Sequence, residues 1–162
     1  MTEETGDTRR GVQMLLKPVG TVSSPYGSMS EAPFQGRFSD NKATVEIYNE
    51  FEDCLKHVEA CDYLIVLYWA HLASREVLKT VTPWGPEQRG VFACRSPSRP
   101  NPIQFCVVEL LERDGNSLVV RGLDAVDGSY VLDIKPYSSR IDSVSEARTG
   151  LFKDRDEKRS GP

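Results

Sequence analysis

Two arginines stand in a proline-rich segment whose residue types suit the binding of an anionic group. Arg95 and Arg99 lie within GVFACRSPSRPNPI, residues 90–103, where three prolines fall within six residues. Each proline fixes its own φ angle and biases the preceding residue toward extended geometry, so the loop loses little entropy when it closes on a ligand. A guanidinium group offers a planar fork that matches a carboxylate or a phosphate. The segment therefore predicts a rigid clamp, although a surface turn with solvated arginines explains the same residues equally well.

Cysteine and histidine could also do chemistry, but their spacing argues against a metal site. The four cysteines form no CxxC pair, and neither His57 nor His71 completes a familiar zinc-ligand spacing. The cysteines stand at positions 54, 61, 94 and 106. We therefore expect no metal and, in a cytoplasmic chain, reduced thiols.

Length and composition are typical of one ordinary globular domain. A chain of 162 residues, 39% hydrophobic and 27% charged, can bury roughly two thirds of the surface that its unfolded form exposes. Its longest apolar run, residues 63–70, is too short to span a membrane, and the N-terminus lacks a secretory signal. We therefore expect a cytoplasmic protein without membrane contact. Because the formal net charge is −4, any RNA contact must come from a local basic cluster.

Short apolar segments separated by turn residues predict mainly β structure. Residues 62–70, DYLIVLYWA, form a continuous apolar run, as in a central strand buried on both sides. Phe51, Leu55 and Val58 recur as on one face of a short helix, with Cys54 and Cys61 on or near that face. Residues 82–86, TPWGP, contain two prolines and predict irregular structure. The other expected strands are residues 15–23, 43–48, 90–93, 103–111, 117–121 and 130–134.

These elements predict an all-β fold, a small single-sheet antiparallel β-barrel with one or two short helices. The domain should span residues 14–142, between a disordered segment at residues 1–13 and a polar tail at residues 143–162. No GxGxxG motif follows the first strand, so a Rossmann nucleotide site is not supported.

Two long motifs resemble the paired signature of the TsaA/TrmO family of tRNA methyltransferases. They are GVFACRSPSRPNPI and, at residues 122–137, GLDAVDGSYVLDIKPY. Further similarity lies in GTVSSPY at residues 20–26, in APFQG at residues 32–36 and in YWAH at residues 68–71. The resemblance covers residues 15–142. It implies a β-barrel methyltransferase that uses S-adenosylmethionine, forms a homodimer and methylates N6 of threonylcarbamoyladenosine beside the tRNA anticodon.

The resemblance also assigns site residues by position. The implied cofactor-binding residues are Gln35, Gly36, Ala70, His71, Arg95, Phe105, Leu123, Asp124 and Ala125. The candidates for binding the RNA substrate are Arg99, Asn101, Lys135 and Tyr137. An acid such as Asp124 can face the sulfonium or the adenosine hydroxyls, and Arg95 can bind the carboxylate. Without the resemblance, a turn at Asp124 and a hydrogen-bonded histidine at a strand end would be the simpler interpretations.

The chain departs from the family pattern inside the predicted site. Cys94 stands where members commonly have threonine, and Gln104, Phe105 and Cys106 replace Gly-Leu-Ser. A bulky glutamine and phenylalanine would reshape the surface that faces the acceptor. Because the lone pair of the N6 nitrogen is delocalised into a carbonyl, a base should help the transfer, and His71 is the catalytic candidate.

Two other functions remain open at this point. One is a methyltransferase that acts on a small molecule or a protein, which the negative charge and the altered residues favour. The other is a non-catalytic protein that binds S-adenosylmethionine. A basic surface joining Lys135, Arg140, Arg95 and Arg99 would favour RNA, whereas an acidic or closed rim would favour a small acceptor.

Overall fold

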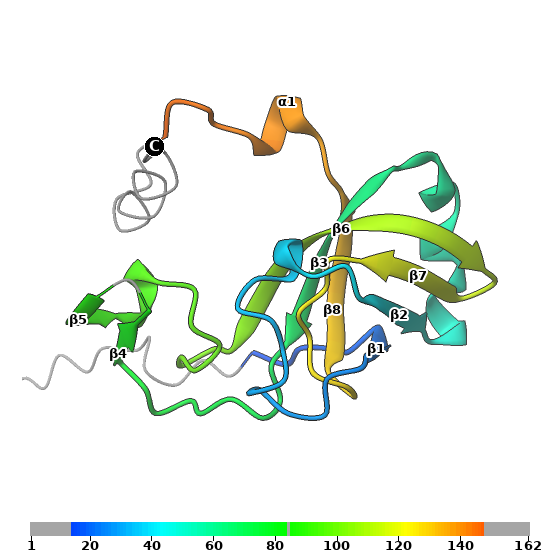
Figure 1. Cartoon of the computed structure of the whole chain (residues 1–162). Helices are drawn as coiled ribbons and strands as arrows, with labels where there is room; N and C mark the ends of the chain where they lie inside the picture. Colours follow the sequence, from blue (N-terminus) through cyan, green and yellow to red (C-terminus); the bar gives the residue numbers. More distant parts are fainter. Residues whose placement is uncertain (1–13, 84, 148–162) are drawn as a thin grey trace, which may run out of the picture.

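Six strands form a closed antiparallel barrel, from which a two-stranded hairpin projects (Figure 1). The computed structural model describes residues 14–83 and 85–147. The strand order is β1-β2-β7-β6-β3-β8, and β8 closes the barrel against β1. The barrel strands are β1 (Gly20–Ser23), β2 (Lys42–Ile47), β3 (Tyr63–Trp69), β6 (Ile103–Asp114), β7 (Ser117–Arg121) and β8 (Tyr130–Pro136). The predicted fold class is confirmed.

Alternation along β3 separates the core of the barrel from its outer surface. Leu64, Val66 and Tyr68 point inward and are 1%, 0% and 5% exposed. Ile65 points outward and is also buried, but Tyr63 at the start of the strand is 47% exposed. The prediction of a strand buried on both sides therefore holds only for its centre.

The pairing of β3 with its two neighbours defines the ends of the barrel. Trp69 pairs with Ile103 at the start of β6 and with Tyr130 at the start of β8. We call this end the site end. Leu64 pairs with Pro136 at the opposite end, which we call the far end.

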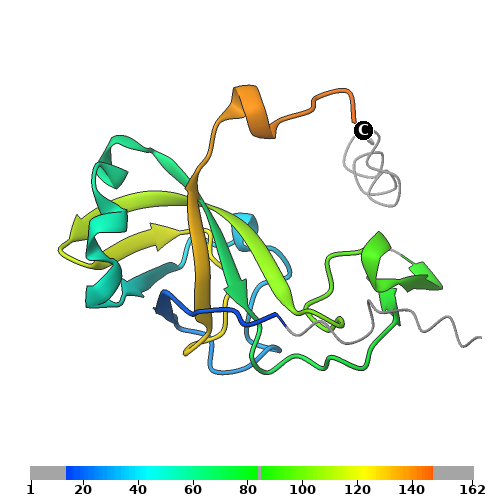
Figure 2. The same ribbon diagram turned by 180° about the vertical axis from the view of Figure 1, so that it is seen from behind.

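The hairpin contradicts the prediction of irregular structure for residues 82–86. Strands β4 (Lys79–Thr82) and β5 (Gly85–Gly90) pair with each other and with no barrel strand. The register between the two strands shifts between Val81 and Thr82, and Pro86 lies opposite this shift on β5. Its missing N–H therefore removes no hydrogen bond from a regular ladder. Figures 1 and 2 show the hairpin standing apart from the barrel on long connections.

Three further local predictions differ from the structure, two in a strand and one in the type of helix. Residues 91–93 form the 3-10 helix η5 (Val91–Ala93), because the Val91 carbonyl accepts hydrogen bonds from Cys94 and Arg99 instead of joining a strand. The first strand begins at Gly20. Pro18, two residues earlier, has no N–H to donate to a neighbouring strand. The predicted short helix is two 3-10 segments, η3 (Asn49–Leu55) and η4 (Val58–Ala60), separated at His57 with a φ of 69°.

The remaining elements are short. The helix η2 (Gly36–Phe38) lies in the loop before β2, and α1 (Ser139–Asp142) follows β8. Cys54, predicted on or near a buried face, is exposed, while Cys61 is half-buried. The predicted disordered segment and most of the predicted tail lie outside the described residues. No helix within residues 14–83 and 85–147 is long and apolar enough to cross a membrane.

Candidate functional site

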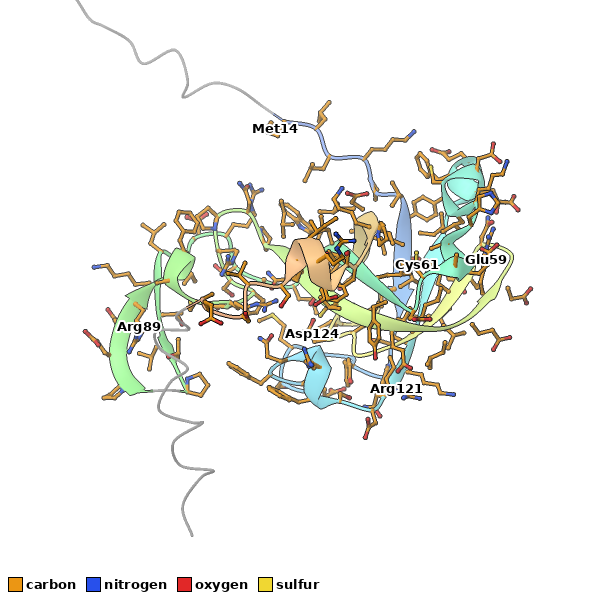
Figure 3. The ribbon with its side chains drawn as sticks, turned by 90° about the horizontal axis from the view of Figure 1, so that it is seen from above. Met14, Glu59, Cys61, Arg89, Arg121 and Asp124 are labelled. Atoms are coloured by element: carbon orange, nitrogen blue, oxygen red, sulfur yellow. The ribbon has the colours of Figure 1, made fainter. Side chains whose placement is uncertain are left out.

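A pocket of about 440 Å³ opens at the site end. Its volume falls within the range of small-molecule and cofactor sites. The residues that line it come from the end of β3, the proline-rich loop, β4 and two turns. They fall within positions 29–35, 68–73, 80–83, 93–99, 103–105 and 124–129. Figure 3 shows Asp124 between the hairpin that carries Arg89 and the far part of the barrel that carries Glu59 and Cys61. Residues of the barrel and of the hairpin both line the pocket.

The Asp124 carboxylate in this pocket is held by three neutral donors. Its Oδ1 atom accepts hydrogen bonds from the Tyr68 hydroxyl at 2.7 Å and from the Cys106 thiol at 2.9 Å. Its Oδ2 atom accepts one from the Gly36 N–H at 3.1 Å. Because none of these donors carries a charge, the carboxylate keeps its negative charge for a cationic or hydroxyl-bearing ligand.

Burial keeps two of those donors protonated. It raises the pKa of the Tyr68 phenol far above its ordinary value of 10.0, and the nearby Asp124 charge raises it further. Burial, and then Asp124, likewise raise the pKa of the Cys106 thiol well above 9.0. A thiol that stays protonated is a poor nucleophile. Cys106 is therefore a hydrogen-bond donor in this site, and so is Tyr68.

Close backbone contact joins the loop at residue 36 to the turn at residues 122–125. A Cβ atom on Gly36 would overlap the carbonyl oxygen of Gly122 and lie 3.0 Å from the Asp124 nitrogen. This contact brings the predicted cofactor residues of both segments together. Leu123 and Ala125, however, are 1% and 0% exposed and pack in the barrel core. Their side chains thus position the turn.

Arg95 and Phe105 lie on the pocket wall as a contacting pair. The Arg95 Nη2 atom donates to the Phe105 carbonyl at 2.9 Å, and its guanidinium carbon lies 5.6 Å from the centre of the Phe105 ring. Gln104 donates from Nε2 to the Pro97 carbonyl at 3.4 Å. Two of the residues that depart from the family pattern thus attach the proline-rich loop to β6.

Arg99 braces the proline-rich loop from within. Its Nε atom donates to the Ser96 carbonyl at 2.8 Å, and its Nη2 atom donates to the carbonyls of Val91 at 2.8 Å and Cys94 at 2.6 Å. The side chain is half-buried and also lines the pocket. Asn101 is exposed and is not among the pocket-lining residues. Binding of the RNA by these two residues stays a prediction.

His71 lines the pocket beside the turn that precedes β8. Its Nδ1 atom lies 3.4 Å from the hydroxyl of Ser129, which is buried, and its ring meets Tyr130 edge-on at 6.3 Å between centroids. Ala70 donates its N–H to the Pro102 carbonyl at 2.9 Å. These contacts fix the chain that leaves β3 against the proline-rich loop.

The structure places the other two candidate RNA-binding residues at the far end. Lys135 pairs in register with Ile65, and its Nζ atom lies 2.6 Å from the Asp133 carboxylate. Tyr137 donates its N–H to the Tyr63 carbonyl at 3.0 Å. Neither lines the site-end pocket. The fold therefore does not join Lys135 to Arg95 and Arg99 in one basic surface.

Sequence reasoning did not select Tyr68, Cys106 or Ser129 as site residues. Tyr68 carried a usable signal, because a phenol on the inward face of a strand needs a hydrogen-bond partner. Cys106 and Ser129 lie in or beside the two motifs, but their hydrogen-bond partners come from distant segments, so the sequence did not reveal their contacts. Within residues 14–83 and 85–147, no group of three or more His, Cys, Asp or Glu side chains could hold a metal ion.

Comparison with known proteins agrees with this barrel fold. Residues 21–143 match the family described as the tRNA-methyltransferase O N-terminal domain. A probable S-adenosyl-L-methionine-binding protein of Archaeoglobus fulgidus is 58% identical over 139 residues, which cover 86% of this chain and 38% of that protein. An S-adenosyl-L-methionine-binding protein of the same organism is 53% identical over 133 residues, covering 82% of this chain and 96% of that protein.

A solved structure shares the fold. The crystal structure of TrmO from Pseudomonas aeruginosa is 29% identical in sequence, with a TM-score of 0.73. The match covers 86% of this chain and 63% of that chain, so this chain spans less than two thirds of the solved protein. Because the family match extends over most of the barrel and the solved fold agrees with it, the chain belongs to the family of the tRNA-methyltransferase O N-terminal domain.

Proposed function

We propose that this chain binds S-adenosylmethionine in the site-end pocket and transfers its methyl group to tRNA, at N6 of threonylcarbamoyladenosine. The observation that carries the proposal is the Asp124 carboxylate, held by neutral donors on the wall of a pocket of cofactor size. The family description, which names a tRNA methyltransferase, and the names of the two relatives, which refer to S-adenosylmethionine, support it.

The residues present fit this cofactor. S-adenosylmethionine carries a cationic sulfonium, ribose hydroxyls and a carboxylate. Asp124 can accept hydrogen bonds from the hydroxyls or face the sulfonium, and the exposed Arg95 guanidinium can bind the carboxylate. Apolar side chains such as Phe105 and Val126 also line the pocket and can cover the adenine. The Gly36 N–H, by contrast, is already bonded to Asp124.

The chain's own residues can provide positioning and a base. Bound S-adenosylmethionine supplies an electrophilic methyl group for an in-line displacement. Holding the acceptor in line can contribute about 7 to 11 kcal/mol, and the proline-rich loop, braced by Arg99, gives the pocket a stiff wall. His71 is the base that we propose. Because its Nδ1 atom faces Ser129, we assign the acceptor's proton to Nε2.

We also propose that the chain works as a homodimer. The β4–β5 hairpin forms a wall of the pocket, yet Leu78, Val81 and Phe92 on or beside it are 69%, 54% and 86% exposed. An isolated two-stranded hairpin is marginally stable in water, so a second copy packed on these side chains would support it. Light scattering should give twice the monomer mass of 18.1 kDa, and the monomer mass at micromolar concentration would contradict the dimer.

Methyl-labelled S-adenosylmethionine tests the acceptor. The protein is incubated with the labelled cofactor and with separate tRNA, protein and metabolite fractions. We expect label in tRNA that carries threonylcarbamoyladenosine, and none in matched tRNA that lacks this modification. Label in protein or metabolites alone would contradict an RNA acceptor, and cofactor binding without transfer would indicate a non-catalytic binding protein. With tRNA as acceptor, the cytoplasm is the location that we expect.

A further inference from the structure

We propose that the outer surface beside the pocket contains a stacking site for an unpaired nucleobase, formed by Trp69, Arg75 and Tyr130. None of these three residues lines the pocket itself. The inference rests on the proposed RNA acceptor, and it adds a place where a base next to the reacting nucleotide would bind.

Strand register aligns two aromatic rings on the outer surface. Trp69 follows the inward-pointing Tyr68, so its side chain points outward. It pairs with Tyr130 on β8 and with Ile103 on β6, and residues that pair directly across antiparallel strands share a face. Tyr130 is 45% and Ile103 is 39% exposed. The three side chains therefore form one accessible row at the site end.

Arg75 lies over the Trp69 ring of this row and is held by two contacts. Its guanidinium carbon lies 5.5 Å from the centre of the Trp69 ring, and its Nε atom donates to the Pro100 carbonyl at 3.0 Å. The residue is nevertheless exposed, and within residues 14–83 and 85–147 it takes part in no ion pair. A positioned and exposed guanidinium group thus has no acidic ion-pair partner in the part of the chain that the structure describes.

These features match a nucleobase with its phosphate. Unpaired RNA bases stack on aromatic rings and on arginine guanidinium planes, and an unneutralised cation also attracts the phosphate that follows the base. A peptide partner would use the apolar rings but has no general need for the cation. The combination therefore favours single-stranded RNA.

The stacking site is continuous with the pocket. Ile103 pairs with Trp69 and also lines the pocket. On the other side, His71 lines the pocket and its ring meets Tyr130 edge-on. An RNA strand with one base in the pocket would therefore pass its neighbouring base over Trp69 and Arg75.

Tryptophan fluorescence tests the stacking site directly. The chain has two tryptophans, Trp69 and Trp84, so Trp69 is the only reporter in a Trp84→Phe variant. We expect a seven-nucleotide oligoadenylate to quench Trp69. Adding Arg75→Ala or Tyr130→Ala should weaken oligonucleotide binding about tenfold, the loss of one stacking contact. Arg75→Lys keeps the charge without the plane and should restore little of the binding.

Arg140→Ala is the matched control, because it removes the same charge from α1, which follows the far end of β8. It should change binding less than twofold. In tRNA methylation, Arg75→Ala should raise KM about tenfold and leave cofactor affinity unchanged. Circular dichroism confirms that the variants are folded.

The outcomes separate this inference from the proposed function. If the protein methylates tRNA but Arg75→Ala and Tyr130→Ala bind the oligonucleotide like the wild type, the stacking site is wrong and the function stands. If Arg75→Ala abolishes quenching in a protein that methylates no tRNA, the stacking site stands and the acceptor is wrong. The stacking site is also overturned if the wild-type protein binds no oligonucleotide. The same holds if the only change in the variants is a lower oligomeric mass.

Discussion

The two ends of the barrel each enclose a hollow, but they hold their charged groups differently. At the site end, in a pocket of about 440 Å³, the Asp124 carboxylate is bonded to the neutral Tyr68 and Cys106. At the far end, in a hollow of about 310 Å³, Lys135 and Asp133 form an ion pair of 2.6 Å. Neutral donors leave a carboxylate its charge, whereas an ion pair cancels it. The way a charge is held therefore distinguishes these hollows better than their size does.

The largest expected effect is the loss of the Asp124 charge. Asp124→Asn should weaken S-adenosylmethionine binding about a hundredfold, because a charge-assisted hydrogen bond is worth about 1.5 to 3 kcal/mol and the new amide N–H₂ would face existing donors. Calorimetry on the full chain measures this. Asp133→Asn at the far end is the matched control and should bind the cofactor like the wild type. Similar losses in both variants would contradict the distinction between the two ends.

Removing the brace of the proline-rich loop should mainly affect stability. Arg99→Ala leaves the carbonyls of Val91, Cys94 and Ser96 without their guanidinium donor. We expect the free energy of unfolding in urea to fall by about 1.5 to 3 kcal/mol, the value of hydrogen bonds to a charged group. An unchanged free energy of unfolding, with a loss confined to tRNA binding, would show that Arg99 serves the substrate instead.

Arg95 should contribute to cofactor binding without a large effect on stability. Its guanidinium is exposed and donates to the Phe105 carbonyl. We expect Arg95→Ala to lower cofactor affinity about tenfold, which corresponds to about 1.4 kcal/mol. Lys135→Ala removes the same charge at the far end and should change affinity less than twofold. Equal affinities for the two variants would exclude Arg95 from the cofactor site.

The buried donors should give stability a pH dependence that appears only in alkaline solution. The folded-state pKa values of Tyr68 and Cys106 are raised, so the stabilisation they contribute is complete below their ordinary values of 10.0 and 9.0. Above those values the unfolded chain releases its protons first, and stability falls by up to about 1.4 kcal/mol per pH unit for each group. Urea unfolding between pH 7 and 10.5 should therefore show a shallower decline from pH 9 for Cys106→Ser than for the wild type. If the free energy of unfolding falls equally with pH in both proteins, the Cys106 thiol contributes nothing to the pH dependence.

The sequence predicts the barrel well because apolar residues alternate with polar ones, or form continuous apolar runs, in the segments that become barrel strands. It fails where tertiary contacts override local preference. The β4–β5 hairpin forms despite its two prolines. Arg99 donates to the Val91 carbonyl, which a strand at residues 91–93 would have paired with a neighbouring strand. Such contacts join residues from separate elements, so no local pattern reveals them.

The predicted site shows the same limit. Gly36, His71, Arg95 and Asp124 come together because turns bring their segments to one end of the barrel. Lys135 and Tyr137 belong to the same motif as Asp124, but they lie at or just after the other end of β8. A strand rises about 3.3 Å per residue, so its length separates them from Asp124. A motif that is continuous in sequence is therefore divided between the two ends.

A crystal structure of the full chain with S-adenosylhomocysteine tests the central claim most directly. We predict that the ligand occupies the site-end pocket, with a polar atom within hydrogen-bond distance of the Asp124 carboxylate and its own carboxylate on Arg95. Ligand bound instead in the far-end hollow beside Cys61 and Lys135, or a site-end pocket that stays empty at saturating ligand, would contradict the claim.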